Sequence, residues 1–201
     1  EMMVKLQPTD AAMAIRKRPF TPEIAALIDE DSMCFLPGGS AAFARPLIYD
    51  ARAALGRSGA PYGQYLLEDV IAKKVPAKLQ VYLAAYSLTP AERAALNQPH
   101  PNTVRAWCYA PGYIQSDRLD VNGIKDLTGF EVKPVSVVPA AVTPTEAGRK
   151  VGLTEGWEAV NSWAPKEPVT PLFSPVASGD EVWATYTDGS PALAVRRTNR
   201  G

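Results

Sequence analysis

Cys108 is the side chain with the most reactive chemistry in this sequence. It lies in the apolar run 105–113, which ends in the turn pair Pro111-Gly112. A cysteine at the end of a strand can act as a nucleophile when a nearby base accepts its proton. The chain has a single histidine, His100, and an extended segment of about 3.3 Å per residue would place it more than about 20 Å from the thiol. We therefore expect Cys108 to be a buried free thiol.

Three consecutive acids, Asp29, Glu30 and Asp31, follow the apolar run 24–28. Acids at this place could hold magnesium for phosphoryl transfer, as in receiver domains. That chemistry also needs a strand-end aspartate and a downstream lysine, and the better strands at 77–88 and 131–142 do not end in them. We expect a solvated loop or a helix cap here.

Metal and cofactor motifs are also missing from the sequence. One histidine and two unpaired cysteines, Cys34 and Cys108, do not make a zinc site. The stretch 37–41 (PGGSA) lacks the Lys-Ser/Thr of a phosphate loop, and 56–63 (GRSGAPYG) is not a dinucleotide fingerprint. We expect no metal and no cofactor, and no pair of carboxylates stands out for glycoside hydrolysis.

The elements that must position these residues alternate along the chain. Apolar runs at 24–28, 77–88 and 103–114 predict strands, and the segments 44–59, 89–98 and 121–130 have helical spacing. In 89–98, the order Thr-Pro-x-Glu predicts a capping box. This order predicts an α/β fold: a doubly wound, mostly parallel sheet flanked by helices, with a C-terminal β-hairpin extension turning at Asp188-Gly189.

Ligands of such sheets bind at the carboxyl ends of the strands. The polar and aromatic residues predicted there could form a site for a small ligand or a sugar. Aromatic side chains pack cores more often than they bind sugars, so packing is the simpler interpretation. The candidate ligand-binding residues are Asp29, Asp31, Tyr86, Tyr109 and Tyr113.

The 201 residues suit one sizeable domain. We expect a linker or N-terminal helix at 1–22, an α/β core at 23–142, and at 143–201 a surface-wrapping segment with the C-terminal hairpin, belonging to the same domain. The segment 143–180 is rich in Pro, Gly, Ser and Thr. The first residue, Glu1, suggests a piece processed or excised from a longer protein.

The composition of the chain limits the kinds of partner that we expect it to bind. Hydrophobic residues make up 46% of the chain, and 21 basic residues balance 21 acidic ones. Balanced charge gives no reason to expect nucleic acid or an anionic membrane as a partner, and no apolar run approaches the roughly 18 residues of a membrane helix. The start, 1–10, has no long apolar signal region. We expect a soluble protein.

The succession of elements resembles a known family. The phrases LGRSGAPY (55–62), YLLEDV (65–70) and LTGF (127–130), in this order of elements, are similar to a glutamine-amidotransferase-like, flavodoxin-like domain. The resemblance implies a flavodoxin-like sheet for the core at 23–142. More narrowly, the phrases resemble the β-galactosidase trimerisation domain that follows the catalytic barrel of glycoside hydrolase family 42 and related large bacterial glycosidases. The resemblance covers roughly 23–197 and includes no catalytic motif.

This resemblance implies a non-catalytic accessory domain of a carbohydrate-active enzyme, in the bacterial cytoplasm or secreted with the parent enzyme. Such a domain buttresses the catalytic barrel of the same polypeptide and takes part in contacts between subunits, so the barrel, a second copy of the chain and a carbohydrate are the partners to expect. It has lost the amidotransferase Cys–His–Glu set, which agrees with the isolated His100. Two other hypotheses stay open: a sugar-binding or small-ligand module, and an unrecognised hydrolase or amidotransferase using Cys108.

Overall fold

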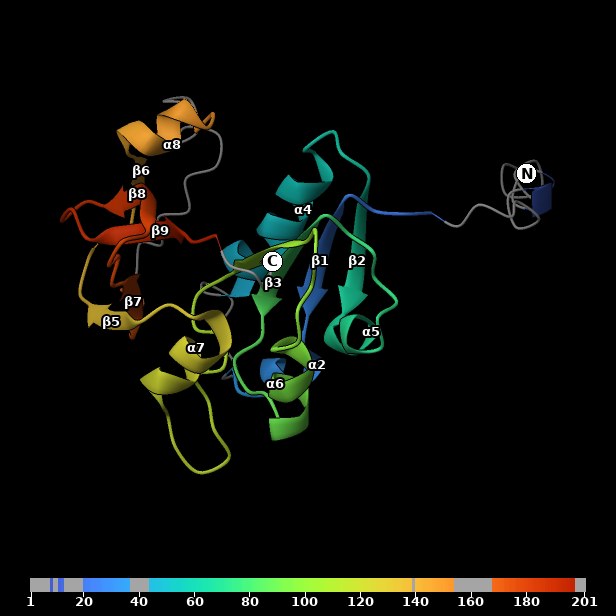
Figure 1. Ribbon diagram of the computed structural model, residues 1–201, viewed down its shortest axis with the longest axis horizontal. Coiled ribbons are helices and arrows are strands. Elements are labelled where there is room, and N and C mark those ends of the chain that lie inside the picture. Colours follow the sequence, from blue (N-terminus) through green and yellow to red (C-terminus); the bar gives the residue numbers. More distant parts are fainter. Residues whose placement is uncertain are drawn as a thin grey trace.

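Four parallel strands form the centre of the fold (Figure 1). The computed structural model describes residues 20–36, 44–138, 140–153 and 168–197, together with 8, 11 and 12. Within them the strands pair in the order β2-β1-β3-β4, which is the order of a flavodoxin-like sheet and confirms the predicted α/β class. The strands are β1 (Ile24–Ile28), β2 (Tyr62–Leu66), β3 (Leu79–Ala84) and β4 (Val104–Trp107).

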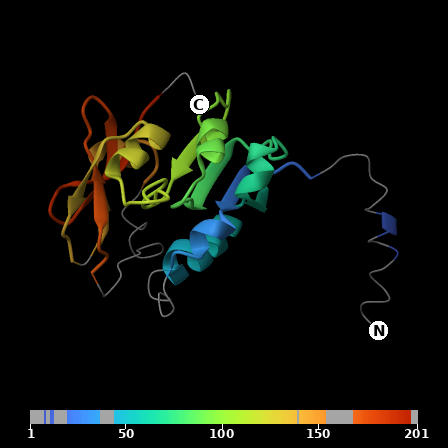
Figure 2. The ribbon, with the colours of Figure 1, turned by 90° about the horizontal axis from the view of Figure 1, so that it is seen from below.

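Helices cover both faces of this sheet, as a doubly wound fold requires (Figure 2). Alternate side chains of a strand point to opposite faces. In β1, Ala26 therefore packs toward one face with Leu55, while Leu27 packs toward the other with Leu67 and Leu96. The helices are α2 (Glu30–Met33), the π-helix η1 (Arg45–Asp50), α4 (Ala51–Gly56), α5 (Leu67–Ile71), α6 (Pro90–Leu96) and α7 (Val121–Thr128).

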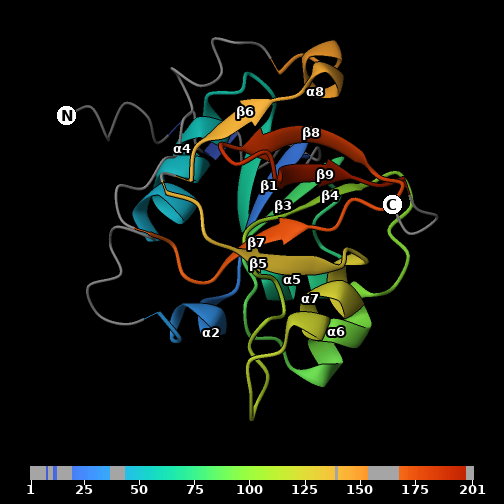
Figure 3. The same ribbon diagram turned by 90° about the vertical axis from the view of Figure 1, so that its left-hand side faces the viewer.

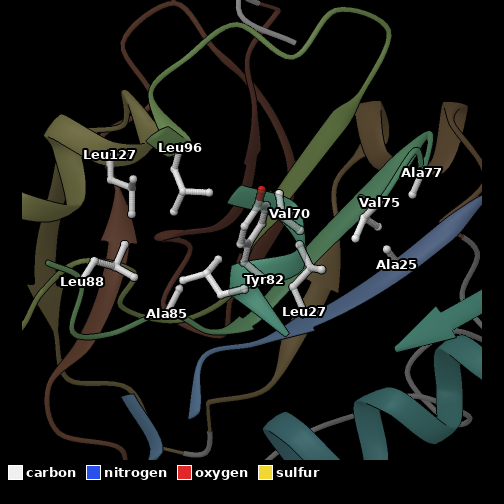
Figure 4. Packing of buried hydrophobic residues seen from close by; sticks show 11 residues of the cluster. Ala25, Leu27, Val70, Val75, Ala77, Tyr82, Ala85, Leu88, Leu96 and Leu127 are labelled. Carbon is white, nitrogen blue, oxygen red and sulfur yellow. The ribbon is translucent and has the colours of Figure 1, made fainter. Parts of the chain in front are cut away.

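The main hydrophobic core surrounds Tyr82, at the centre of β3 (Figure 4). Its ring stacks on Trp107 of β4, with centroids 4.0 Å apart, and its hydroxyl donates to the amide oxygen of Gln80 at 2.9 Å. Tyr82 is thus both buried and hydrogen-bonded, which removes the cost of burying its polar atom. Helices α5 and α6 close this core through Val70 and Leu96.

A second group of strands is antiparallel and lies to one side of the parallel sheet, so that it is in front of that sheet in the view of Figure 3. One pair joins β5 (Val132–Val135) to β7 (Leu172–Pro175). The other sheet has the order β6-β8-β9, from β6 (Val142–Pro144), β8 (Glu181–Tyr186) and β9 (Pro191–Val195), and α8 (Glu146–Lys150) packs against β8. We call these strands with α8 the antiparallel unit.

The antiparallel unit begins earlier in the chain than the expected core boundary at 142. Strand β5 pairs with β7 and does not extend the parallel sheet. Pro134 explains this, because a proline lacks the amide hydrogen that a central strand needs. The expected surface segment also differs, because Leu172, Phe173 and Ser174 of β7 are buried.

Local signals place several elements as predicted. Helix α6 begins with the capping box: Thr89 Oγ1 accepts from the Glu92 amide at 3.3 Å, and Glu92 Oε2 accepts from the Thr89 amide at 2.7 Å. Helix α7 ends at Gly129, which has a left-handed φ of 80°. Strands β8 and β9 form the predicted hairpin, with Gly189 at φ 84° in its turn.

Two sequence expectations lie outside what the structure describes. Most of the expected N-terminal linker or helix at 1–22 belongs to this part of the chain, and so does 154–167, with its two tryptophans. Among the described helices, none has the length and apolar character needed to cross a bilayer.

Candidate functional site

The carboxyl edge of the parallel sheet, where this fold class binds ligands, holds a small polar group between β1 and β3. Asp29 follows β1 and caps α2 by accepting from the Ser32 amide at 3.1 Å and from the Ser32 hydroxyl. The Ser32 hydroxyl oxygen also accepts from the Ser87 amide at 2.9 Å. The group therefore ties together the ends of two neighbouring strands.

Asp29 is only 7% exposed. Burial raises the pKa of its carboxyl above the ordinary range, while the hydrogen bonds from Ser32 act in the opposite direction. Asp31 is instead exposed in the first turn of α2. The structure thus separates the two predicted acids: Asp29 is a helix cap and Asp31 faces solvent. Among the described residues, no cluster of three His, Cys, Asp or Glu side chains could hold a metal.

The three candidate tyrosines do come together, but against other aromatic rings. Tyr86 is 3% exposed and meets Tyr109 edge-on, with centroids 5.8 Å apart. Tyr109 and Tyr113 both contact Phe173 of β7, at centroid distances of 6.3 and 5.1 Å. Phe173 is itself buried, so these rings fill the space between the parallel sheet and the antiparallel unit.

The hydroxyls of two of these tyrosines are used within the protein. Tyr109 donates to the carbonyl oxygen of Pro171 at 2.7 Å, and Tyr86 donates to that of Leu83 at 3.3 Å. Burial raises the pKa of Tyr109 to about 12 and also raises that of Tyr86. A sugar-binding face would need these rings and hydroxyls to be open to a ligand, and here they pack.

Cys108 and His100 lie at opposite ends of β4. His100 precedes the amino end of the strand, and Cys108 follows its carboxyl end and packs with Val81 and Leu83. Burial raises the pKa of the Cys108 thiol to about 11. A nucleophilic cysteine needs the opposite shift, from a cation or a base. The other thiol, Cys34, is exposed.

A cavity of about 360 Å³ lies at the other edge of the sheet, next to the amino ends of β3 and β4. His100, Lys73 and Gln80 contribute its polar side chains, together with Gln98 and Thr103. The sequence analysis did not predict this place, because it weighed His100 only as a base for Cys108 and as a zinc ligand. The stretch 99–102 (PHPN) was the available signal: a histidine held between two prolines is rigidly placed.

No family model and no curated protein matches this chain.

Proposed function

We propose that this chain is a non-catalytic structural domain of a carbohydrate-active enzyme, a β-galactosidase-like glycoside hydrolase, which buttresses the catalytic barrel or joins subunits. The observation that carries the proposal is the closed carboxyl edge of the parallel sheet. Tyr86 and Tyr109 occupy this edge, and Phe173 of the antiparallel unit packs over it. The place where a flavodoxin-like fold usually binds its ligand is here part of the core.

The thiol chemistry supports the same proposal. An amidotransferase or hydrolase would need an activated Cys108, and burial shifts the pKa of this thiol to about 11, away from activation. The only imidazole of the chain is that of His100, before the opposite end of β4. The residues at the strand ends therefore favour packing over catalysis.

Surface side chains also suit a domain that contacts other protein. Several large apolar residues are more than half exposed, and scattered residues of this kind are ordinary on a monomer. They offer contact area without defining one interface, so the proposal rests on the closed edge. These residues include Phe20, Phe35, Tyr49 and Leu119.

The test is a hydrolase assay of the 201-residue chain against a panel of nitrophenyl glycosides, the β-galactoside included. We expect the rate of buffer alone. The Cys108→Ser and His100→Ala variants serve as controls for a contaminating enzyme, which neither substitution would affect. Turnover that is present in the unaltered chain and lost in either variant would overturn the proposal.

Calorimetry with galactose and lactose tests the closed edge directly. We expect no heat of binding, because the candidate tyrosines are packed. Binding that Tyr86→Ala or Tyr109→Ala abolishes, in variants that keep the native circular dichroism, would show that the edge opens to a sugar. In that case the chain is a carbohydrate-binding module.

A further inference from the structure

The cavity at the amino ends of β3 and β4 is built from two segments that approach each other. One is the end of α5 and the loop after it, and the other is the loop from α6 into β4. This places the cavity at the opposite edge of the sheet from the packed tyrosines. Its volume of about 360 Å³ lies in the range of small-molecule sites.

The floor of the cavity is apolar and fixed. Val70, Val75 and Leu96 are buried there. Gln80 is buried as well, and both ends of its amide are engaged: Nε2 donates to the Val75 carbonyl at 3.3 Å, and Oε1 accepts from the Tyr82 hydroxyl. A ligand would therefore meet a hydrocarbon surface below and would find its polar contacts at the rim.

Lys73 is at the rim, in a conformation that favours glycine. It follows α5 with a left-handed φ of 56°. Its amide donates to the Val70 carbonyl and the Lys74 amide to the Asp69 carbonyl, both at 2.8 Å, as in a helix end where glycine is usual. A lysine costs stability at this position, and in return it brings an ammonium group to the cavity.

His100 lies across from this segment in a turn that two prolines restrain. Pro99 precedes it and Pro101 follows it, and Asn102 has a left-handed φ of 61°, the order of a type II turn. The Thr103 amide donates to the His100 carbonyl at 3.3 Å and closes the turn. The His100 Nε2 atom is buried, and no group among the described residues is within hydrogen-bonding distance of it. Buried polar atoms are nearly always hydrogen-bonded, so a nitrogen without a partner in the protein favours a ligand that supplies one.

The ionisable side chains that line the cavity are all basic. Its lining includes Lys73 and His100, and none of the described lining residues is an Asp or a Glu. Arg105 adds a further positive charge nearby, where its guanidinium donates to the Leu96 carbonyl at 2.6 Å. Burial lowers the pKa of His100, and the charges of Arg105 and Lys73 lower it further. The cationic field therefore reaches the imidazole.

We propose that this cavity binds a small organic anion, whose carboxylate or phosphate group contacts Lys73 and His100 while its apolar body covers Val70, Val75 and Leu96. The unpartnered imidazole nitrogen, the lysine in a glycine-favouring conformation and the absence of carboxylates from the described lining all point to the same ligand chemistry. The site does not depend on the structural role proposed above, since it uses none of the residues at the closed edge.

The single histidine makes the test direct, because its ring resonances in a ¹H–¹³C spectrum report this cavity alone. The probes are benzoate, phenyl phosphate and the neutral benzamide, titrated at constant ionic strength into the 201-residue chain. We expect saturable shifts of the His100 ring with at least one of the two anions and none with benzamide. Which anion binds more tightly distinguishes a carboxylate ligand from a phosphate ester.

Two variants separate binding from folding. Lys73→Gly suits the left-handed backbone, so its melting temperature should be equal to or above that of the unaltered chain. Its affinity for the anion should fall at least about tenfold, as expected for loss of a charge-assisted hydrogen bond. Lys150→Gln removes a positive charge from α8, in the antiparallel unit, where Lys150 is exposed and paired with Glu146, and it should leave binding unchanged.

Three results would overturn the proposal. Equal shifts with benzamide and benzoate would make the cavity a nonspecific apolar pocket. An affinity for the anion that is unchanged in Lys73→Gly would mean that Lys73 does not contact the anion. If none of the three probes shifts the His100 ring resonances at up to millimolar concentration, the cavity holds only solvent.

Discussion

The hydroxyl of Tyr109 donates to the carbonyl oxygen of Pro171 at 2.7 Å, and this bond joins the end of the parallel sheet to the antiparallel unit. Tyr109 has a left-handed φ of 62°, just after Cys108 and the end of β4. This backbone conformation is costly for a residue with a side chain, and it ends the strand where the ring turns toward Phe173. The aromatic contact thus accompanies a local departure from strand geometry.

The first prediction concerns this hydrogen bond. Tyr109→Phe keeps the ring packing but leaves the Pro171 carbonyl without its donor, so we expect the free energy of unfolding to fall by about 1–2 kcal/mol. Urea denaturation followed by tryptophan fluorescence measures this loss. Tyr49→Phe is the matched control, because Tyr49 is 58% exposed, and it should change stability by less than about 0.5 kcal/mol. Equal stability of the two variants would contradict the role given to Tyr109.

The second prediction concerns the contact between α8 and β8. A Cβ atom on Gly148 would lie 2.0 Å from the Trp183 carbonyl oxygen, which is backbone and cannot swing away. Gly148→Ala should therefore cost about 1–3 kcal/mol or more, as overpacking does. Gly56→Ala is the control with the opposite sign: its Cβ meets only Tyr62 at 3.6 Å, and alanine favours a helix by up to about 1 kcal/mol. Thermal unfolding of both variants checks the pair.

Much of the fold could be predicted because its signals are local. The apolar run 24–28 coincides with β1, and the capping box at Thr89 begins α6. Gly129 and Gly189 each occupy a left-handed position that few other residues accept. Signals of this kind need only neighbouring residues, so the sequence displays them directly.

The candidate site was harder to predict because it depends on contacts between distant segments. The tyrosines were expected at the strand ends, and they are there, but their packing against Phe173 depends on where β7 folds back. The cavity likewise arises from the approach of 70–75 to 98–103. Nothing in either segment alone indicates that the other lies beside it.

The third prediction distinguishes the two thiols and tests the remaining enzyme hypothesis. With the pKa of Cys108 raised to about 11, roughly one thiol in a thousand is ionised at pH 8, and only the thiolate reacts. Iodoacetamide at this pH should add one group to the native chain, at the exposed Cys34, and a second only in urea. Intact mass spectrometry counts the adducts, and native Cys34→Ser should stay unmodified. Rapid modification of Cys108 in the native chain would instead favour a nucleophilic thiol.

The fourth prediction follows from the environment of His100. Burial, and then the charges of Arg105 and Lys73, lower the pKa of its imidazole, so its NMR titration midpoint should fall below the ordinary value of about 6.5. Lys73→Gln removes one of the opposing charges and should raise the midpoint. A midpoint above 6.5, or one that Lys73→Gln lowers, would contradict the cationic field on which the anion site depends.

The same shift makes stability depend on pH. Because the folded imidazole has the lower pKa, the unfolded chain binds the proton more readily, and stability rises with pH wherever that difference holds. The contribution of His100 is therefore complete above about pH 6.5 and is lost as the pH falls toward the folded pKa. The raised pKa of Asp29 has the opposite effect, because it makes stability fall with rising pH from about pH 3.8 upward. The contributions of His100 and Asp29 must therefore be separated. The free energy of unfolding in urea is measured for the unaltered chain and for His100→Gln, at pH 7 and at pH 5. The difference between the two chains isolates the contribution of His100, and it should be smaller at pH 5.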